Sequence, residues 1–202
     1  MILAFDTSSE ACTAALFEAD GTLAARADER IGRGHAERLV PMLAELIGQS
    51  RPSEILVGTG PGSFTGIRVA VAAAHGLAIG WEARLYGFSS LALLAAVAEP
   101  DGQPVAAVIL GGHGQLFVQQ FDGSTLEPEG PVRSLVPEAA ARAISARSVI
   151  GSGAAALVAA RGHGASADAL PRAADARLLP EALRSLPPRP IYGRPPDAKP
   201  MQ

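Results

Sequence analysis

The stretch Gly58-Thr-Gly-Pro-Gly-Ser-Phe-Thr-Gly-Ile-Arg68 contains the residue types from which proteins build anion sites. It lies between an apolar run, Ile55–Val57, and a long segment with the pattern of a helix. Glycine-rich loops at a helix N-terminus offer backbone N–H groups to a phosphate. The same order of strand, loop and helix also folds a tight corner below a helix that packs on another surface. The residues assigned to this loop are Gly60, Pro61, Gly62, Ser63 and Gly66, with Ser63 or Thr65 as helix cap.

Two observations weaken the phosphate hypothesis for this loop. Its pattern is neither Gly-x-x-x-x-Gly-Lys nor Gly-x-Gly-x-x-Gly. The nearest cation is Arg68, one turn into the helix, and the single lysine of the chain is Lys199. A phosphate-binding or Schiff-base lysine is therefore nearly excluded.

A second candidate is the turn Asp6-Thr7-Ser8 after the first apolar run, Ile2–Phe5. In a tight hairpin, N–H groups and hydroxyls can face a phosphate while the carboxylate holds a hydrated metal. The alternative is an Asx-type turn, in which these side chains bond their own backbone. The spacing favours the Asx turn, so Asp6, Thr7 and Ser8 are vestigial phosphate-binding candidates.

Other catalytic constellations are missing from the sequence. The histidines, His35, His75, His113 and His163, are isolated, and no His-x-x-x-His pair exists. The single cysteine, Cys12, excludes an intramolecular disulfide. Gly151-Ser-Gly153 lacks the full Gly-x-Ser-x-Gly form. We therefore predict no catalytic residue and no metal site.

Composition predicts a packed protein without a strong electrostatic preference. The 202 residues are 48% hydrophobic and 18% charged, with a net charge of −3. Neither half has the basic excess of a stand-alone nucleic-acid binder. The chain opens directly on a strand, and the uncharged run Val69–Gly80 is shorter than the roughly 20 residues of a membrane span. We expect a cytoplasmic protein with no membrane segment.

Hydrophobic periodicity predicts two α/β halves that repeat weakly. The expected strands are Ile2–Phe5, Cys12–Phe17, Leu23–Arg30, Ile55–Val57, Leu85–Phe88, Val105–Leu110, Leu116–Phe121 and Ser148–Ile150. The expected helices are His35–Ile47, Phe64–Trp81, Ser89–Val97, Pro137–Ser145, Ala154–Arg161 and Leu178–Leu186, with Gly162–Ala174 as a loop. The turn Glu99–Gly102 divides residues 1–100 from 101–186, and residues 187–202 form a proline-rich tail that is extended or docked.

The helix expected at Phe64–Trp81 is apolar on more than one side. Ile67, Val71, Ala74 and Leu77 share one face, and Val69, Ala70, Ala73 and Gly76 share another. Such a helix is covered on two sides. One cover is its own sheet, and the second is the helix His35–Ile47 together with another chain. Alternatively, the two helices pack together within one monomer and need no partner.

The motifs described above resemble one known family. MILAFDTSSEACTAALF, His35-Ala-Glu-Arg-Leu-Val-Pro41 and GTGPGSFTGIRVAVAAAHGLA are similar to the TsaB (YeaZ-like) family. Members are non-catalytic subunits of the bacterial machinery that makes threonylcarbamoyladenosine in tRNA. The resemblance covers about residues 1–95, and Pro190-Ile-Tyr192-Gly-Arg194 is similar to the family's Pro-x-Tyr-Leu-Arg tail.

The resemblance implies two actin-like (ASKHA, ribonuclease-H-like) lobes, the second one reduced. It implies a scaffold that binds a catalytic TsaD-like subunit, joined by a TsaE-like ATPase, and that forms a homodimer in isolation. ATP or ADP and metal would then lie on the partner, this chain would have no cofactor of its own, and tRNA would be reached only through the complex. The implied interface residues are His35, Leu39, Met42, Leu43, Leu46, Phe64, Ile67, Arg68, Val71 and Ala73.

One departure and two alternatives stay open. Leu110-Gly-Gly-His-Gly-Gln115 stands where the family often carries an Asp-Ala-Arg-x-Gly-Glu-like turn, so charged groups are missing from a second phosphate loop. An ATP-dependent, kinase-like transferase that relies on Asp6, Thr7 and Ser8 is the main alternative. A peptidase is the other, and the sequence offers neither a nucleophile set nor a zinc set for it.

Overall fold

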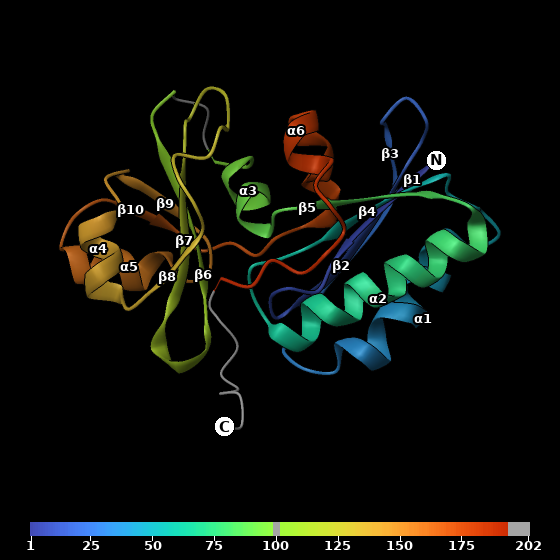
Figure 1. Ribbon diagram of the computed structural model, residues 1–202, viewed down its shortest axis with the longest axis horizontal. Helices are drawn as coiled ribbons and strands as arrows, with labels where there is room; N and C mark the ends of the chain where they lie inside the picture. Colours follow the sequence, from blue (N-terminus) through green and yellow to red (C-terminus); the bar gives the residue numbers. More distant parts are fainter. Residues whose placement is uncertain (99–101, 194–202) are drawn as a thin grey trace, which may run out of the picture.

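The computed structural model describes residues 1–98 and 102–193, which form two five-stranded mixed sheets (Figure 1). The first sheet has the strand order β3-β2-β1-β4-β5. Its central strand β1 pairs antiparallel with β2 and parallel with β4. The strands are β1 (Ile2–Asp6), β2 (Ala11–Phe17), β3 (Leu23–Arg30), β4 (Glu54–Gly58) and β5 (Arg84–Phe88).

The second sheet repeats this topology in a smaller form. Its order is β10-β9-β6-β7-β8, in which β6 again pairs antiparallel with the next strand and parallel with the fourth. The strands are β6 (Val105–Leu110), β7 (Leu116–Phe121), β8 (Arg133–Leu135), β9 (Ser148–Ile150) and β10 (Ala165–Ala167). The last three have three residues each. The expected α/β fold with two related lobes, the second reduced, is thus confirmed.

Helices form two outer layers and one inner layer. α1 (His35–Ile47) and α2 (Phe64–Trp81) cover the outer face of the first sheet, and α4 (Pro137–Ala143) and α5 (Ala154–Arg161) cover the outer face of the second (Figure 1). Between the sheets lie α3 (Ser90–Ala95) and the 3₁₀ helix η2 (Ala173–Leu178). The one-turn helix α6 (Glu181–Arg184) contacts β5.

The inner helices are exchanged between the lobes. α3 follows the first sheet in the chain but also packs on β6 and β7. η2 follows the second sheet but packs on β1 and β2, where the backbone N–H of Ala173 donates to Thr13 Oγ1 at 2.9 Å. One core cluster therefore draws on both sheets, including Phe17, Phe88, Ile109 and Phe121.

Several expectations need correction in the second half. The strand β10 lies inside the segment expected to be a loop, and β8 was not expected. The single helix expected at Leu178–Leu186 is instead the end of η2 followed by α6, because Pro180 separates them. α3 ends two residues before the expected Val97. Most of the turn chosen as the lobe boundary, residues 99–101, lies outside the described residues.

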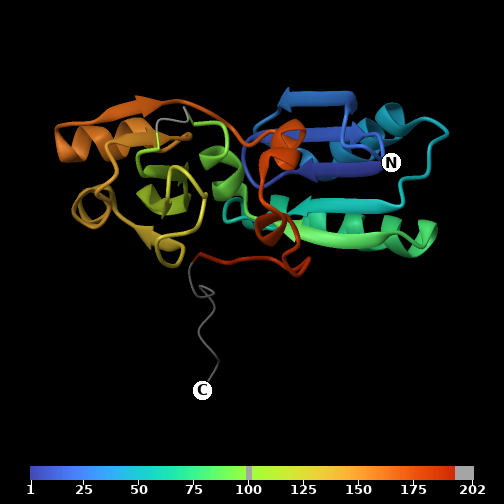
Figure 2. The same ribbon diagram turned by 90° about the horizontal axis from the view of Figure 1, so that it is seen from above.

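The proline-rich tail is docked over its described part, residues 187–193, and the remainder of the tail lies outside the described residues. Just before it, Leu186 pairs with Gly87 of β5 in both directions, at 2.7 and 3.0 Å. Ile191 N–H then donates to Thr59 O at 2.8 Å. Figure 2 shows this segment running from the first lobe back toward the second.

Candidate functional site

The turn Asp6-Thr7-Ser8 is fully enclosed by the chain itself. The three residues are at most 1% exposed. Ser8 N–H donates to Asp6 Oδ1 at 2.6 Å, which is the Asx-type turn favoured by the sequence. Ser90 Oγ, from the start of α3, donates to Asp6 Oδ2 at 2.6 Å, and Thr7 Oγ1 donates to Gly66 O at 2.6 Å. Each side chain is occupied by a bond inside the chain.

The glycine loop packs directly on this turn. A Cβ added at Gly58 would lie 1.9 Å from Asp6 Oδ2, one at Gly62 would lie 2.0 Å from Ser8 O, and one at Gly66 would lie 1.9 Å from Thr7 O. Ser63 caps α2 by accepting from Gly66 N–H. The space beside these glycines is filled by the Asp6 side chain and by backbone oxygens, which supports the interpretation of this loop as a corner.

Burial sets the electrostatics of Asp6. Loss of solvent raises the pKa of the Asp6 carboxyl, while the bonds from Ser90 and Ser8 and the nearby His35 oppose the shift. When the pKa of a carboxyl is higher in the folded chain than in the unfolded chain, the group stabilises the fold at pH values below its pKa in the unfolded chain. This contribution is lost as the pH rises through its pKa in the folded chain. Asp6 therefore weakens the fold near neutral pH.

We predict that Asp6→Asn stabilises the chain more near neutral pH than at about pH 4. The amide can still accept from Ser8 N–H and can donate to Ser90 Oγ, without a charge to desolvate. Each unit of pKa difference corresponds to about 1.4 kcal/mol. Thermal unfolding across pH measures the effect. Asp20 is the matched control, because Thr22 lowers its pKa and Asp20→Asn should give the opposite sign.

The second lobe carries an equivalent corner. A Cβ at Gly151, where φ is +121°, would lie 2.2 Å from Val108 O, and Ser152 Oγ accepts from Leu110 N–H at 3.1 Å. The hairpin turn beside it contains a 3₁₀ turn, η1 (Gly112–Gly114), with His113 in the left-handed region. Over residues 1–98 and 102–193, no three metal-ligating side chains gather in one place.

The predicted interface residues differ in burial: Phe64 and Arg68 are exposed, and Leu46 and Ala73 are partly buried. Most of them lie in the core between the helices and the first sheet, within a single chain. The buried members are His35, Leu39, Met42, Leu43, Ile67 and Val71, all at most 8% exposed. Their burial leaves little surface for direct contact with a partner, and their part in an interface stays a prediction. The apolar stripe of each helix faces the first sheet.

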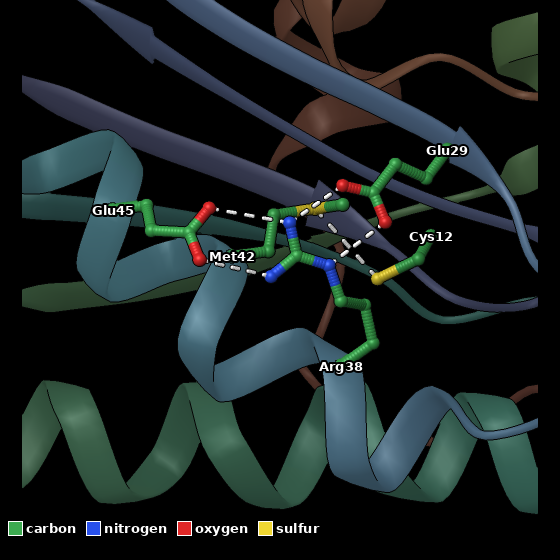
Figure 3. Close-up of polar contacts among 5 residues, drawn as sticks. All are labelled: Cys12, Glu29, Arg38, Met42 and Glu45. Atoms are coloured by element: carbon green, nitrogen blue, oxygen red, sulfur yellow. Dashed lines mark hydrogen bonds and ion pairs between the residues drawn. The ribbon is translucent and has the colours of Figure 1, made fainter.

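Figure 3 shows how α1 is fixed on the sheet. Arg38 donates from Nε to Glu29 Oε2 of β3 at 2.8 Å and from Nη1 to Glu45 Oε1 at 3.1 Å. Below it, Cys12 Sγ lies 3.7 Å from Met42 Sδ in the core. Burial raises the pKa of the Cys12 thiol to about 11, so it stays protonated and is a poor nucleophile.

Two neighbouring residues of α1 distinguish core from surface. We predict that Leu39→Ala lowers the free energy of unfolding of the isolated chain by about 2–5 kcal/mol, because Leu39 is fully buried. Val40→Ala, on the outer face at 61% exposure, should change it by less than about 0.5 kcal/mol. Denaturant titration of both variants at low protein concentration is the measurement. Equal losses would contradict the burial described here.

The outer face of α2 is apolar and open in the single chain. At the spacing of one helical face it presents Phe64, Arg68, Ala72, His75, Gly76 and Ile79. Phe64 is 52% and Ile79 80% exposed. The length and composition of α2 would allow it to cross a membrane. This is weak evidence for a membrane span, because core helices of soluble proteins pass the same test. Its inner face packs on β4, β5 and β1.

Comparison with known proteins agrees with this architecture. A family model described as "TsaD: tRNA N6-adenosine threonylcarbamoyltransferase" matches residues 28–148, more than half of the chain. This match and the two five-stranded mixed sheets define the class: a two-lobed α/β protein related to the TsaD family. The chain belongs to the TsaB (YeaZ) family.

Three relatives carry this conclusion. The Escherichia coli protein "tRNA threonylcarbamoyladenosine biosynthesis protein TsaB" is 41% identical over 99 residues, which are 46% of this chain and 42% of that protein. The chain thus matches less than half of that relative's length. "YeaZ from Pseudomonas aeruginosa" matches with a TM-score of 0.75 and 28% identity over 95% of this chain and 98% of its own. A Pseudomonas aeruginosa protein described by its similarity to peptidase YEAZ gives 0.75 and 31% over 96% and 99%.

The structure also adds residues that the sequence did not indicate. Ser90 bonds Asp6, and the tail places Tyr192 beside Arg68, whose Nε donates to Tyr192 Oη at 3.0 Å. The one signal for the second contact was the likeness of residues 190–194 to the family's tail.

Proposed function

We propose that this chain is a scaffold subunit that binds a TsaD-like catalytic subunit and supports threonylcarbamoyl transfer to adenosine of tRNA. The observation that carries the proposal is the open apolar face of α2. Arg68 and His75, both on this face, are the only ionisable groups of the 18 residues of α2, and 28% of these residues are buried within the chain. Exposed apolar area of this kind marks a protein–protein interface.

The shape of this face suits a second helix. Ala72, Gly76 and Gly80 recur at intervals of four residues, and added Cβ atoms at Gly76 and Gly80 meet nothing within 4 Å. Small residues at this spacing let another backbone approach closely. Phe64 and Ile79, near the two ends of the helix, and Val40 of α1 add large apolar side chains. Self-association through the same face would explain a homodimer when the partner is absent.

The interior of the chain supports a role without chemistry. Asp6, Thr7 and Ser8 form hydrogen bonds within the corner under α2, and these bonds set the position of the helix. We place the nucleotide and metal on the TsaD-like subunit, assign contact with tRNA to the complex, and expect a TsaE-like ATPase to join it in the cytoplasm.

Sedimentation velocity tests the proposal. The chain is run alone, then with the TsaD-like protein of the same genome, with and without ATP. We expect a homodimer that gives way to a one-to-one complex. A chain that sediments as a monomer and does not bind the TsaD-like protein would overturn the proposal. If the chain alone hydrolysed ATP and Asp6→Asn abolished this activity, the kinase-like alternative would be favoured.

A further inference from the structure

Arg68 stacks over the Phe64 ring on the outer face of α2, with the Tyr192 ring beside both. Its Cζ lies 3.6 Å from the centroid of the Phe64 ring and 5.7 Å from that of Tyr192, and the two rings are 5.4 Å apart. Its Nε donates to Tyr192 Oη at 3.0 Å. Stacking and this bond fix the plane of the guanidinium. Because the side chain is already ordered in the free chain, less side-chain entropy remains to be lost when a partner binds it.

The tail segment that supplies Tyr192 is fixed by contacts of its own. Ile191 N–H donates to Thr59 O at 2.8 Å, and Pro188 O lies 3.1 Å from His75 Nε2. At the start of the segment Leu186 pairs with β5. Tyr192 is therefore placed by the glycine loop and by α2, independently of its bond to Arg68.

Arg68 has a charge that no carboxylate of the described residues neutralises. Within residues 1–98 and 102–193, it forms no ion pair, whereas Arg30, Arg38, Arg84 and Arg172 each pair with a carboxylate. The Nε position is taken by Tyr192, and the two terminal nitrogens remain to donate side by side. That pair of donors fits the two oxygens of a carboxylate.

We propose that the partner subunit presents an acidic side chain opposite Arg68, and that the docked tail, through Tyr192, is part of the binding surface. This inference rests on the proposed function. When the apolar face of α2 is buried, an unpaired guanidinium within it would be costly, so a partner that fits the face must pair it. A protein carboxylate suits the surroundings better than an RNA phosphate, because RNA binding draws on several cations and this face has one permanent charge.

The experiment measures the dissociation constant of the purified TsaD-like protein for the full chain and its variants, over a range of salt. We expect Arg68→Met to weaken binding by about 30-fold or more and to remove most of the salt dependence. Arg68→Lys should recover little of the loss, because a lysine cannot donate in parallel. Arg84→Met, which removes an exposed arginine paired with Glu54 at the sheet edge, is the control and should bind normally.

Tyr192 is a positioning residue, and its variants separate the ring from the hydroxyl. Tyr192→Phe keeps the stack and should cost a few-fold in affinity, whereas Tyr192→Ala should cost about 10-fold. The loss should disappear when Arg68 is already Met, because the two residues act together. Unchanged melting temperatures show that the tail still docks.

The outcomes separate this inference from the proposed function. Normal binding by Arg68→Met, with unchanged salt dependence, would overturn the inference and leave the scaffold function standing. Absence of binding by the unmodified chain would overturn both. If the isolated chain bound tRNA and Arg68→Met abolished this binding, the ligand of Arg68 would be a phosphate instead of a carboxylate, and the inference would be overturned.

Discussion

Gly66→Ala is expected to lower the free energy of unfolding by about 3 kcal/mol or more, the upper end of overpacking costs. Gly66 lies in the first turn of α2 with no positive φ, so helix propensity alone would favour alanine. The methyl group would, however, lie 1.9 Å from Thr7 O, a backbone atom that cannot rotate away. The same shift would strain the bond from Thr7 Oγ1 to Gly66 O. Thermal or denaturant unfolding of the isolated chain measures the loss.

Gly76→Ala is the matched control on the same helix. Nothing lies within 4 Å of its added Cβ, and it should stabilise the isolated chain by about 0.5–1 kcal/mol. If Gly66→Ala destabilised the chain and Gly76→Ala stabilised it, the corner, and not the helix, would be the part that is sensitive to an added methyl group. A stable Gly66→Ala variant would mean that the loop and the turn are separable, which would reopen the phosphate hypothesis.

Ile79→Glu is expected to abolish association while the monomer stays folded. Ile79 is 80% exposed, so the change should move the stability of the isolated chain by less than about 0.5 kcal/mol. In a complex that buries this face, the carboxylate would be desolvated without a partner, and we expect the dissociation constant to rise by about 100-fold or more. Sedimentation of the chain alone and with the TsaD-like protein measures both losses.

Leu110→Glu provides the control for this change. Leu110 is 55% exposed but belongs to the second lobe, away from α1 and α2 (Figure 1). Association should survive it. If the two variants weakened binding equally, the docking surface would extend across both lobes, and the assignment to α2 would be wrong. Ala73, one of the interface residues that the resemblance implied, is less suitable for such a change because it is partly buried against the core.

Periodicity predicted the first lobe well because its elements are long. The bounds of α1 and α2 match the expected ranges, and each expected strand of the first sheet is present within a residue or so. In the second lobe, β8 and β10 have three residues each, too few to show an alternation. They form strands because they pair with β7 and β9. This pairing depends on the fold and cannot be predicted from the local sequence of each segment.

The candidate site was harder to predict than the fold. The resemblance implied Leu39, Ile67 and Val71 as interface residues, and the structure places them in the core between the helices and the first sheet. A helix that is apolar on several sides does not reveal which side faces its own sheet. Phe64 and Arg68 were implied as interface residues as well, and they are exposed. Tyr192 lies 124 residues from Arg68 in the chain, and no local pattern links the two.

The exchange of inner helices between the lobes has a consequence for any attempt to divide the protein. A fragment that ends before β6 would leave Leu91 and Leu93 without the second sheet, and the complementary fragment would carry η2 without β1 and β2. Each half would keep the cluster under its outer helices but would expose its part of the shared inner cluster, so we expect one calorimetric transition for the chain and aggregation of either fragment when it is expressed alone. Hinged opening between two independent domains, as in many two-lobed enzymes, is correspondingly disfavoured.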